Sequence, residues 1–521
     1  MPAKFHSIAL IGLNAVPIDV EADISRATLP TFKVVGLPDT SVREAKERVR
    51  AAIKNSGLPF PRARITVNLA PAHIRKEGPG HDLAMALAIV AATGPPQALS
   101  LSCREPVERS KGSRRLFLGE LALDGSVRPV IGALPAVMAA IEDGFDEIYV
   151  PRGNSEEAAL ALGKEKSDTK LFPVSSLAGI FSHLTGMETI ECAKPIEQTA
   201  DKPGTYPVDF SNVHGQEHAK RALEIAASGN HNILMSGPPG SGKTMLARAL
   251  PSILPEMIHE EVLEVTKIRS IAGTLEDNAQ LVTARPFRSP HHSASGVALI
   301  GGGSWPRPGE ISLAHRGVLF LDEFPEFPRS VLENLRQPLE EGFVTVSRAQ
   351  CTLRFPAKFT LVAAQNPCPC GYLTDPSTDC TCGQAEIERY RRRVSGPLLD
   401  RIDLHIEVPR VKPEELLKRP SSEPSARIRE RVESARDRAR QRLKSDNIIT
   451  NGEMGHLQIR RHCALDTETE NFLCTAAERM NLSARAVSRS LKVARTIADL
   501  AGSDTIKKQH LAEALQFRTR R

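Results

Sequence analysis

The residues best suited to do chemistry form a glycine-rich loop between an apolar run and a segment of helical character. The loop fits the pattern G-x-x-x-x-G-K-[ST] and consists of Gly237, Pro238, Pro239, Gly240, Ser241, Gly242, Lys243 and Thr244. In such a loop the backbone N–H groups point at phosphate oxygens, and the following helix adds its positive end. The pattern therefore predicts a nucleotide site in which Lys243 contacts the β- and γ-phosphates and Thr244 contacts Mg²⁺.

A second pair of candidate residues follows the apolar run 317–321, which has the character of a buried strand. Asp322 is placed to complete the Mg²⁺ shell, and Glu323 is placed to polarise an attacking water. Two adjacent acids are also common at solvated strand ends. Because they follow a phosphate loop upstream, the pair predicts nucleotide hydrolysis.

Four cysteines form the third candidate group, as two C-x-C pairs: Cys368, Cys370, Cys380 and Cys382. Four thiolates can surround Zn²⁺ tetrahedrally, and clustered cysteines in a reducing compartment favour Zn²⁺ over disulfides. The C-x-C spacing is less common than C-x₂-C, so free or redox-active thiols are the alternative. In either case the cluster would hold a loop directly after the expected strand 359–364.

Composition indicates a globular protein of several domains. The chain has 521 residues, of which 41% are hydrophobic and 25% charged, so about three domains are expected. The net charge of +6 permits a nucleic-acid partner without requiring one. The start of the chain has no signal-peptide core, and no stretch reaches the roughly 18 apolar residues of a membrane span. These features predict a cytoplasmic protein with no membrane partner, and nine cysteines, an odd number, argue against a disulfide framework.

Four segments are expected from the distribution of patterns and breakers. They are an N-terminal domain at 1–185, a proline-containing linker at 186–210, a nucleotide-binding core at 211–410 and a helical segment at 411–521. Within the first of these, the residue periodicity predicts strands at 63–70 and 147–150 and helices at 41–56 and 131–143.

Residues 76–83 and 119–135 resemble the ATP-dependent Lon protease domain. In that family the first stretch carries the nucleophilic serine and the second the lysine that activates it. The matching positions here are Gly80 and Pro135. The resemblance implies an α+β Lon-like domain, and because glycine has no hydroxyl and proline no amine, it implies a domain without peptidase activity.

The order of segments around the phosphate loop resembles that of the magnesium-chelatase-like AAA+ ATPases. Together with the Lon-like N-terminal part, it resembles the YifB/ComM family over nearly the whole chain. This resemblance implies an α/β fold, with a P-loop AAA+ core of parallel sheet and helices on both faces, and a C-terminal helical lid. It also implies ATP and Mg²⁺ as cofactors.

The same resemblance assigns further site residues. Asn366 matches the sensor that orients water against the γ-phosphate, and Arg485 matches the lid arginine that touches the nucleotide of its own subunit. Arg401 matches the finger that reaches the neighbouring subunit's nucleotide, so a homo-oligomer, most simply a hexameric ring, is implied. The alternative for Arg401 is a surface arginine paired to Asp400 or Asp403.

Segment 343–358 alternates in polarity as a β-hairpin should, and Arg348, Arg354 and Lys358 make it positive. In related ring motors a hairpin here projects into the central pore and grips the substrate. A phosphate-contacting role and a solvated hairpin both fit the sequence.

Two further features favour structural interpretations. His291 and His292 are neighbours, and on an extended chain their side chains point opposite ways, so a structural or substrate-facing loop is favoured over a metal site. The arginine-rich stretch 425–444 interleaves acids at helical spacing, which favours a solvated, salt-bridged face over a nucleic-acid stripe.

ComM-like members of the family resemble DNA motors that promote branch migration while single strands are integrated during natural transformation. The expected function is therefore an ATP-driven ring motor, a helicase or translocase on single-stranded or branched DNA. A magnesium-chelatase-like ATPase that remodels a partner protein uses the same core. A Lon-like protease lacks its dyad at Gly80 and Pro135, and a non-enzymatic DNA-binding factor is disfavoured by the acids Asp322 and Glu323.

Overall fold

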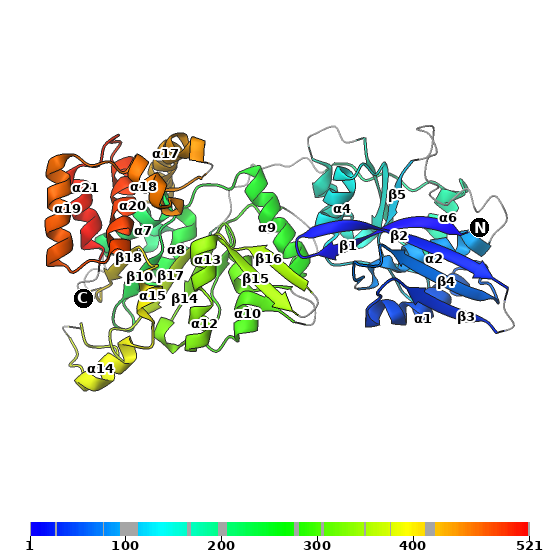
Figure 1. Ribbon diagram of the computed structural model, residues 1–521, viewed down its shortest axis with the longest axis horizontal. Helices are drawn as coiled ribbons and strands as arrows, with labels where there is room; N and C mark the ends of the chain where they lie inside the picture. Colours follow the sequence, from blue (N-terminus) through cyan, green and yellow to red (C-terminus); the bar gives the residue numbers. More distant parts are fainter. Residues whose placement is uncertain are drawn as a thin grey trace. The chain divides into compact units, whose positions relative to one another are not determined.

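The computed structural model describes residues 2–26, 29–76, 78–93, 113–163, 168–195, 206–275, 281–303, 307–348, 351–375, 377–411, 423–446 and 448–518. Residues 196–205 of the predicted linker and 412–422 at the start of the predicted helical segment lie outside these ranges. The chain divides into two compact units, one of Met1–Thr199 with Thr266–Val282 and one of Ala200–Val265 with Thr283–Arg521 (Figure 1).

Unit 1 is built, within the described residues, on a seven-stranded mixed sheet of order β3-β4-β2-β1-β5-β8-β9. The β1–β2 and β2–β4 pairs are antiparallel, and the other neighbours run parallel. The strands are β1 (Ala3–Ile11), β2 (Asn14–Ser25), β3 (Thr31–Val35), β4 (Arg64–Ala70), β5 (Arg115–Phe117), β8 (Glu147–Pro151) and β9 (Lys170–Val174), and a small ribbon pairs β6 (Glu120–Leu121) with β7 (Val127–Arg128).

Helices cover both faces of this sheet. On β1, Phe5 packs into one hydrophobic cluster and Ile8 into another, as residues of opposite parity on a strand must. The first cluster contains α2, which is buried along ten of its residues. The helices are α1 (Thr40–Asn55), α2 (Asp82–Thr93), α4 (Ala133–Glu142), α5 (Ser155–Ala159) and α6 (Leu177–Leu184).

Residues Thr266–Val282, which the sequence analysis placed inside the 211–410 core, belong to unit 1. They include the second half of α9 (His259–Ala272), where Ile268 and Ile271 are buried. Ser270 Oγ donates a hydrogen bond of 2.5 Å to the buried Glu157 carboxylate. Unit 1 is therefore assembled from two separate stretches of chain.

The two positions that match the Lon dyad lie inside unit 1. Gly80 is in a short 3₁₀ turn, Pro79–His81, where a Cβ would lie 3.3 Å from Leu118 Cδ1. Pro135 is buried in α4.

Unit 2 is centred on a five-stranded parallel sheet of order β11-β14-β17-β10-β18 among the residues described. Its strands are β10 (Ile233–Ser236), β11 (Phe287–Arg288), β14 (Val318–Leu321), β17 (Thr360–Gln365) and β18 (Leu404–Glu407). The strands are short and apolar on both faces, which is typical of a parallel sheet covered on both sides. This is the α/β arrangement that the sequence predicts.

Helices and two ribbons complete unit 2. The ribbons pair β12 (Gly301–Gly302) with β13 (Arg307–Pro308) and β15 (Phe343–Arg348) with β16 (Cys351–Pro356). The helices are α7 (Glu217–Gly229), α8 (Lys243–Ala249), the first half of α9, α10 (Gly296–Ile300), α11 (Glu310–Leu313), α12 (Arg329–Glu333), α13 (Arg336–Glu341), α14 (Gln384–Arg391), α15 (Gly396–Leu399), α17 (Ser425–Leu443), α18 (His456–His462), α19 (Thr467–Arg479), α20 (Ala484–Leu500) and α21 (Lys508–Gln516).

The C-terminal helices share a hydrophobic core with the sheet. One cluster of buried side chains contains Met235 of β10, Phe320 of β14, Val432 of α17 and Ile497 of α20. No helix of the described residues combines the length and the apolar character needed to cross a membrane.

A buried carboxylate joins two of these helices. Asp499 of α20 accepts two hydrogen bonds from Arg442 of α17, at 2.7 and 2.6 Å, and one of 2.9 Å from Arg495. Asn451 donates a further hydrogen bond of 2.8 Å. Asp499 and Arg495 are each 2% exposed and are enclosed by protein, whereas Arg442 is partly exposed.

Asp499→Ala is expected to lower the free energy of unfolding by about 3–5 kcal/mol, because Arg495 would lose its buried carboxylate partner. Urea unfolding followed by circular dichroism measures this change. The control is Glu468→Ala, which removes an exposed pair with Lys508 and should cost less than about 1 kcal/mol. Equal small losses in both variants would show that the network does not hold the helices together.

Candidate nucleotide-binding site

The site lies at one edge of the unit 2 sheet. Strands β14, β17 and β10 are adjacent and parallel, so their carboxyl ends meet at the same edge. The residues that follow them are Asp322, Asn366 and Gly237, respectively. Three stretches that are far apart in the sequence are thereby brought together.

The phosphate loop depends on its glycines. Gly240 and Gly242 have φ of +74° and +88°, a left-handed conformation that L side chains rarely adopt. At Gly237 a Cβ would lie 2.2 Å from the carbonyl oxygen of Val408. Glycine is therefore favoured at Gly240 and Gly242 by backbone conformation, and at Gly237 because a side chain would clash with the backbone.

Lys243 is buried at the start of α8 and is held by oxygen atoms. Its Nζ donates to Gly237 O at 2.6 Å, to Pro238 O at 3.0 Å and to Asn366 Oδ1 at 3.3 Å. Burial lowers the pKa of Lys243, and the nearby charge of Asp322 works in the opposite direction. The ammonium group thus lies inside the loop among acceptors that phosphate oxygens could replace.

Thr244 and Asp322 form the second part of the site. Thr244 Oγ1 donates to Asp322 Oδ2 at 3.1 Å, and Glu323 N donates to Asp322 Oδ1 at 2.9 Å. Hydroxyl and carboxylate oxygens are the ligands that Mg²⁺ prefers. In the loop itself, Ser241 Oγ is buried and makes no hydrogen bond within the described part of the chain. This donor set fits a magnesium nucleotide: Thr244 and Asp322 would hold the metal and Lys243 the phosphates.

Glu323 contacts a residue that the sequence analysis did not connect with it. Its backbone has φ of +50°, and its Oε2 lies 2.9 Å from His292 Nδ1. The expectation that His291 and His292 point in opposite directions is wrong, because their ring centroids are 4.0 Å apart. The segment is a turn and not an extended strand, so the alternation of a strand does not apply.

Arg401 is buried, and its ion-pair partner among the described residues is Glu340 rather than Asp400 or Asp403. Its guanidinium forms an ion pair with Glu340, and Nη1 donates to Pro397 O at 2.6 Å. The residue is only 4% exposed. The pKa of Arg401 is lowered, chiefly by burial. The charge of Glu340 works in the opposite direction, and the charges of Arg336 and Arg485 lower the pKa further. A role in a neighbouring subunit's site would require Arg401 to exchange its contact with Glu340.

Helix α20 carries the predicted lid arginine in its first turn and, in the next turn, a second arginine that the sequence analysis missed. Arg485 is exposed. One turn later, Arg489 donates to Asp403 Oδ1 at 2.5 Å and to Arg401 O at 3.0 Å. Burial raises the pKa of Asp403, but Arg489 and His231 outweigh it and hold that pKa well below its ordinary value. The lid helix is thus tied by charge to the segment that carries Arg401.

The hairpin β15–β16 has the predicted alternation. Val344, Val346 and Phe355 are buried, whereas Arg354 is exposed and its guanidinium lies 4.8 Å from the centre of the Phe343 ring. Lys358, just after the hairpin, pairs with Glu453 at 3.4 Å. The side chain of Arg348 lies outside the described residues.

The arginine-rich stretch forms α17, but it is not a wholly solvated face. Arg436 is buried and donates twice to the carbonyl of Ala227, at 2.9 and 2.6 Å. Arg429 donates to Ser252 O at 2.7 Å. These arginines hold the helix against the nucleotide-binding core, which sequence spacing alone could not show.

Comparison with known proteins agrees with this architecture. Residues 209–416 match the family described as magnesium chelatase, subunit ChlI, residues 422–518 match its C-terminal region, and residues 20–154 match the family described as subunit ChlI of Mg-chelatase. The fold and the site together define a magnesium-chelatase-like AAA+ ATPase.

Individual relatives show to which family within this class the chain belongs. The chain is 43% identical to competence protein ComM of Haemophilus influenzae over 520 residues, covering 99% of this chain and 97% of that protein. It is 43% identical to YifB of Escherichia coli over 514 residues, covering 98% and 96%. Magnesium-chelatase subunit ChlI of Mesostigma viride is 27% identical over 205 residues, covering 35% of this chain and 56% of that protein. The chain belongs to the ComM/YifB family.

His292→Ala is expected to lower the rate of ATP hydrolysis by about tenfold with little change in ATP affinity, because the imidazole contacts Glu323 and not the phosphate loop. Steady-state hydrolysis and titration with a fluorescent ATP analogue separate the two quantities. His291→Ala is the matched control, since its hydrogen-bond partner is Ser293. A His292→Ala variant with wild-type turnover would remove any role for this contact.

Proposed function

We propose that this chain is an ATP-hydrolysing ring motor that moves on DNA, as a helicase or branch-migration enzyme during natural transformation or recombination. The observation that carries the proposal is the meeting of Lys243, the Thr244–Asp322 pair and Glu323 at one sheet edge. The near full-length similarity to a protein named as a competence protein supports the choice of DNA as substrate.

In the proposed reaction each residue has a distinct task. Lys243 neutralises charge on the β- and γ-phosphates, and Asp322 and Thr244 hold Mg²⁺. Glu323 accepts a proton from the attacking water, while His292 fixes the direction of its carboxylate. Asn366, which already contacts Lys243 Nζ, orients that water against the γ-phosphate.

Two arginines couple hydrolysis to movement between subunits. Arg401 is proposed to leave Glu340 and to stabilise charge on the γ-phosphate of the neighbouring subunit, in a ring that we take to be hexameric. Arg485 is proposed to contact the nucleotide of its own subunit. Arg489 lies on the same helix as Arg485 and contacts Asp403 and the carbonyl of Arg401. It therefore links the helix that carries Arg485 to the segment that carries Arg401.

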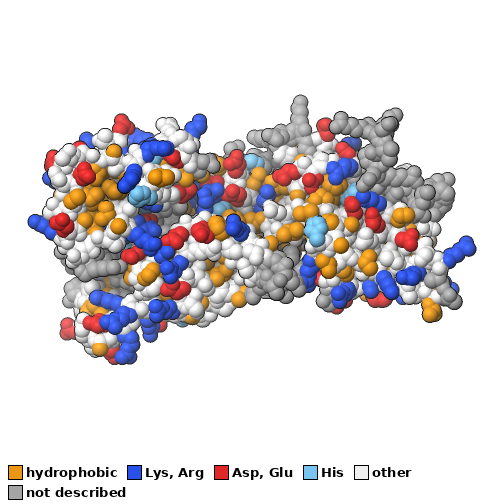
Figure 2. Space-filling view, viewed as in Figure 1, with side chains coloured by type: hydrophobic (Ala, Val, Ile, Leu, Met, Phe, Trp, Pro, Cys, Tyr) orange, Lys and Arg blue, Asp and Glu red, His pale blue; other side chains and the backbone are white. Residues whose placement is uncertain are grey.

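An exposed group of arginines supports a DNA partner. Lys and Arg side chains gather over α14 (Figure 2), where Arg329, Arg389, Arg392 and Arg393 line a hollow of about 450 Å³ together with Pro325, Glu326 and Phe327. Such clusters attract phosphate backbones without reading bases. The exposed Arg354 on the hairpin adds a second positive site.

The second candidate is an ATPase that remodels a partner protein. The partial similarity to a magnesium-chelatase subunit favours it, because that similarity covers a motor core of the same type. This candidate shares the nucleotide site but not the need for exposed arginines. We further propose that unit 1 has no peptidase activity, which the residues at Gly80 and Pro135 support.

Single-stranded and forked DNA are expected to raise the ATP hydrolysis rate several-fold at low salt, because phosphate contacts weaken steeply as salt rises. Glu323→Gln should abolish hydrolysis and serves as the blank. Arg389→Ala with Arg392→Ala should weaken DNA binding and reduce its salt dependence, whereas Arg427→Ala on α17 should not. Hydrolysis indifferent to every DNA would favour the remodelling of a partner protein.

Mixing two inactive variants tests the role of Arg401. Lys243→Ala and Arg401→Ala should each lose about 100-fold or more in hydrolysis rate. A mixture should regain activity, up to about a quarter of the wild-type rate if subunits mix at random, because Arg401 of one variant completes the site of the other. Absence of recovery, with mixed oligomers shown by mass, would contradict a finger acting between subunits.

A further inference from the structure

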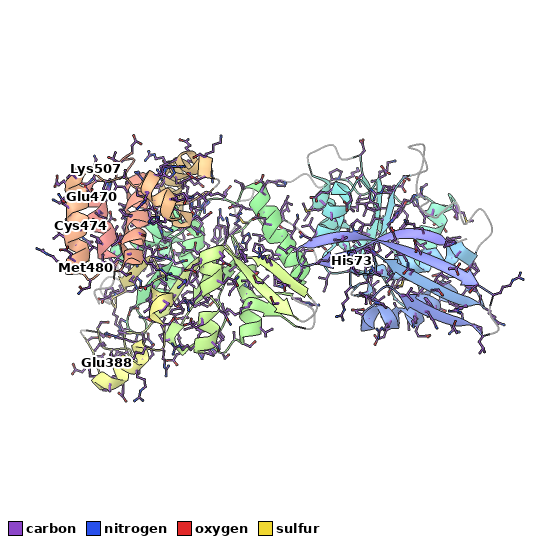
Figure 3. The ribbon with its side chains drawn as sticks, in the orientation of Figure 1. His73, Glu388, Glu470, Cys474, Met480 and Lys507 are labelled. Carbon is purple, nitrogen blue, oxygen red and sulfur yellow. The ribbon has the colours of Figure 1, made fainter. Side chains whose placement is uncertain are left out.

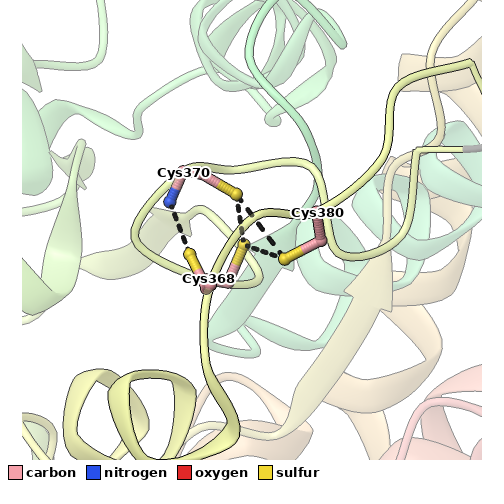
Figure 4. A group of neighbouring side chains, drawn as sticks. Cys368, Cys370 and Cys380 are labelled. Atoms are coloured by element: carbon pink, nitrogen blue, oxygen red, sulfur yellow. Dashed lines mark hydrogen bonds between the residues drawn. The ribbon is translucent and has the colours of Figure 1, made fainter.

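The four cysteines of the two C-x-C pairs converge on one point. Figure 4 labels three of them, Cys368, Cys370 and Cys380. Cys368 Sγ lies 3.3 Å from Cys370 Sγ and 3.7 Å from Cys380 Sγ, and Cys370 and Cys380 are 3.6 Å apart. With Cys382, all four sulfurs lie within 4.8 Å of one another. They come from two arms of one loop, so local sequence spacing alone does not force this meeting.

These distances distinguish between the forms that four thiols can take. A disulfide would bring two sulfurs to about 2.05 Å, much closer than any pair here. Four thiolates at about 2.3 Å from a tetrahedral Zn²⁺ are about 3.8 Å from one another, close to the separations observed. Without a cation, four thiolates at this range would repel one another.

The surroundings have the character of a structural metal site. Cys382 Sγ accepts a hydrogen bond of 3.3 Å from Cys370 N, the kind of contact that orients a metal ligand. Cys368 is fully buried, and the other three cysteines are partly covered. All four ligand positions come from the chain, as in closed structural zinc sites.

The same loop touches the nucleotide site. Cys368 follows Asn366 by two residues, and Gly371 N donates to Cys368 O at 3.0 Å. At Gly371 a Cβ would lie 2.7 Å from Pro239 Cδ and 3.8 Å from Asn366 Cγ. The cysteine loop is thus packed against the phosphate loop and holds one end of the segment that carries Asn366.

The geometry points to a structural Zn²⁺ bound by Cys368, Cys370, Cys380 and Cys382, which braces Pro239 of the phosphate loop and the sensor Asn366. Loss of the metal releases the cysteine loop, and with it the backing of the phosphate loop. The metal therefore sets the affinity of the chain for ATP as well as holding the loop. The link to affinity rests on the proposed binding of ATP at residues 237–244, whereas the metal site stands without it.

Metal content tests the first part. Elemental analysis of the purified chain should find about one zinc per chain, and Cys380→Ser with Cys382→Ser should contain none. Cys474→Ser is the matched control, because Cys474 is an exposed cysteine on α19 (Figure 3) and should leave zinc content unchanged. Growth with Co²⁺ should give the visible absorption of a tetrahedral thiolate site. Iron in place of zinc, or no metal and a disulfide detected by mass, would overturn the assignment.

Reversible zinc removal tests the second part in the wild-type chain, so that misfolding of a variant cannot decide the outcome. Stripping zinc with a thiol-reactive mercurial, followed by thiol and Zn²⁺, should weaken the affinity for a fluorescent ATP analogue about tenfold and then restore it. Unchanged affinity after zinc loss would overturn the bracing role. A chain that holds zinc but binds no ATP would instead overturn the proposed function and, with it, the link to the phosphate loop, while the zinc site would stand.

Discussion

The nucleotide site depends on the fact that β14, β17 and β10 run parallel and side by side. In a parallel sheet the carboxyl ends of all strands lie at one edge. The sheet therefore brings together the loop before α8, the acids after β14 and the amide after β17. In the observed register Ser236 of β10 lies opposite Gln365 of β17, and Leu321 of β14 lies opposite Ala363 of β17. The contacts of Lys243 with Asn366 and of Thr244 with Asp322 follow from that register.

Around this edge, buried charges link elements that would otherwise move separately. Asp403 is nearly enclosed, and it is kept ionised by Arg489 from α20 and by His231 beside β10. Removing one partner of such a pair leaves a charge stranded away from water, which costs several kcal/mol. A movement of α20 is therefore expected to move the segment before β18 as well, and the reverse.

Local sequence patterns were sufficient to predict the secondary-structure elements and the phosphate loop of the site. They were not sufficient to predict which side chains pair with one another. The phosphate loop, the strand before Asp322 and the hairpin 343–358 are each specified by glycine positions or apolar spacing within a few residues. The contact of His292 with Glu323 joins two loops. The contact of Arg489 with Asp403 joins α20 to the residue just before β18. The partners of long polar side chains depend on distances that packing sets. The alternative considered for Arg401, a surface pair with Asp400 or Asp403, is therefore replaced by an ion pair with Glu340.

The return of Thr266–Val282 to unit 1 has a consequence for synthesis on the ribosome. The first 199 residues leave the ribosome without the stretch that supplies Ile268, Ile271 and the hydroxyl partner of Glu157. At about 5–20 residues per second, roughly 4 to 17 seconds pass before residue 282 is made. During that interval residues 200–265 of unit 2 are also made, so unit 1 completes its fold only after part of unit 2 has been synthesised.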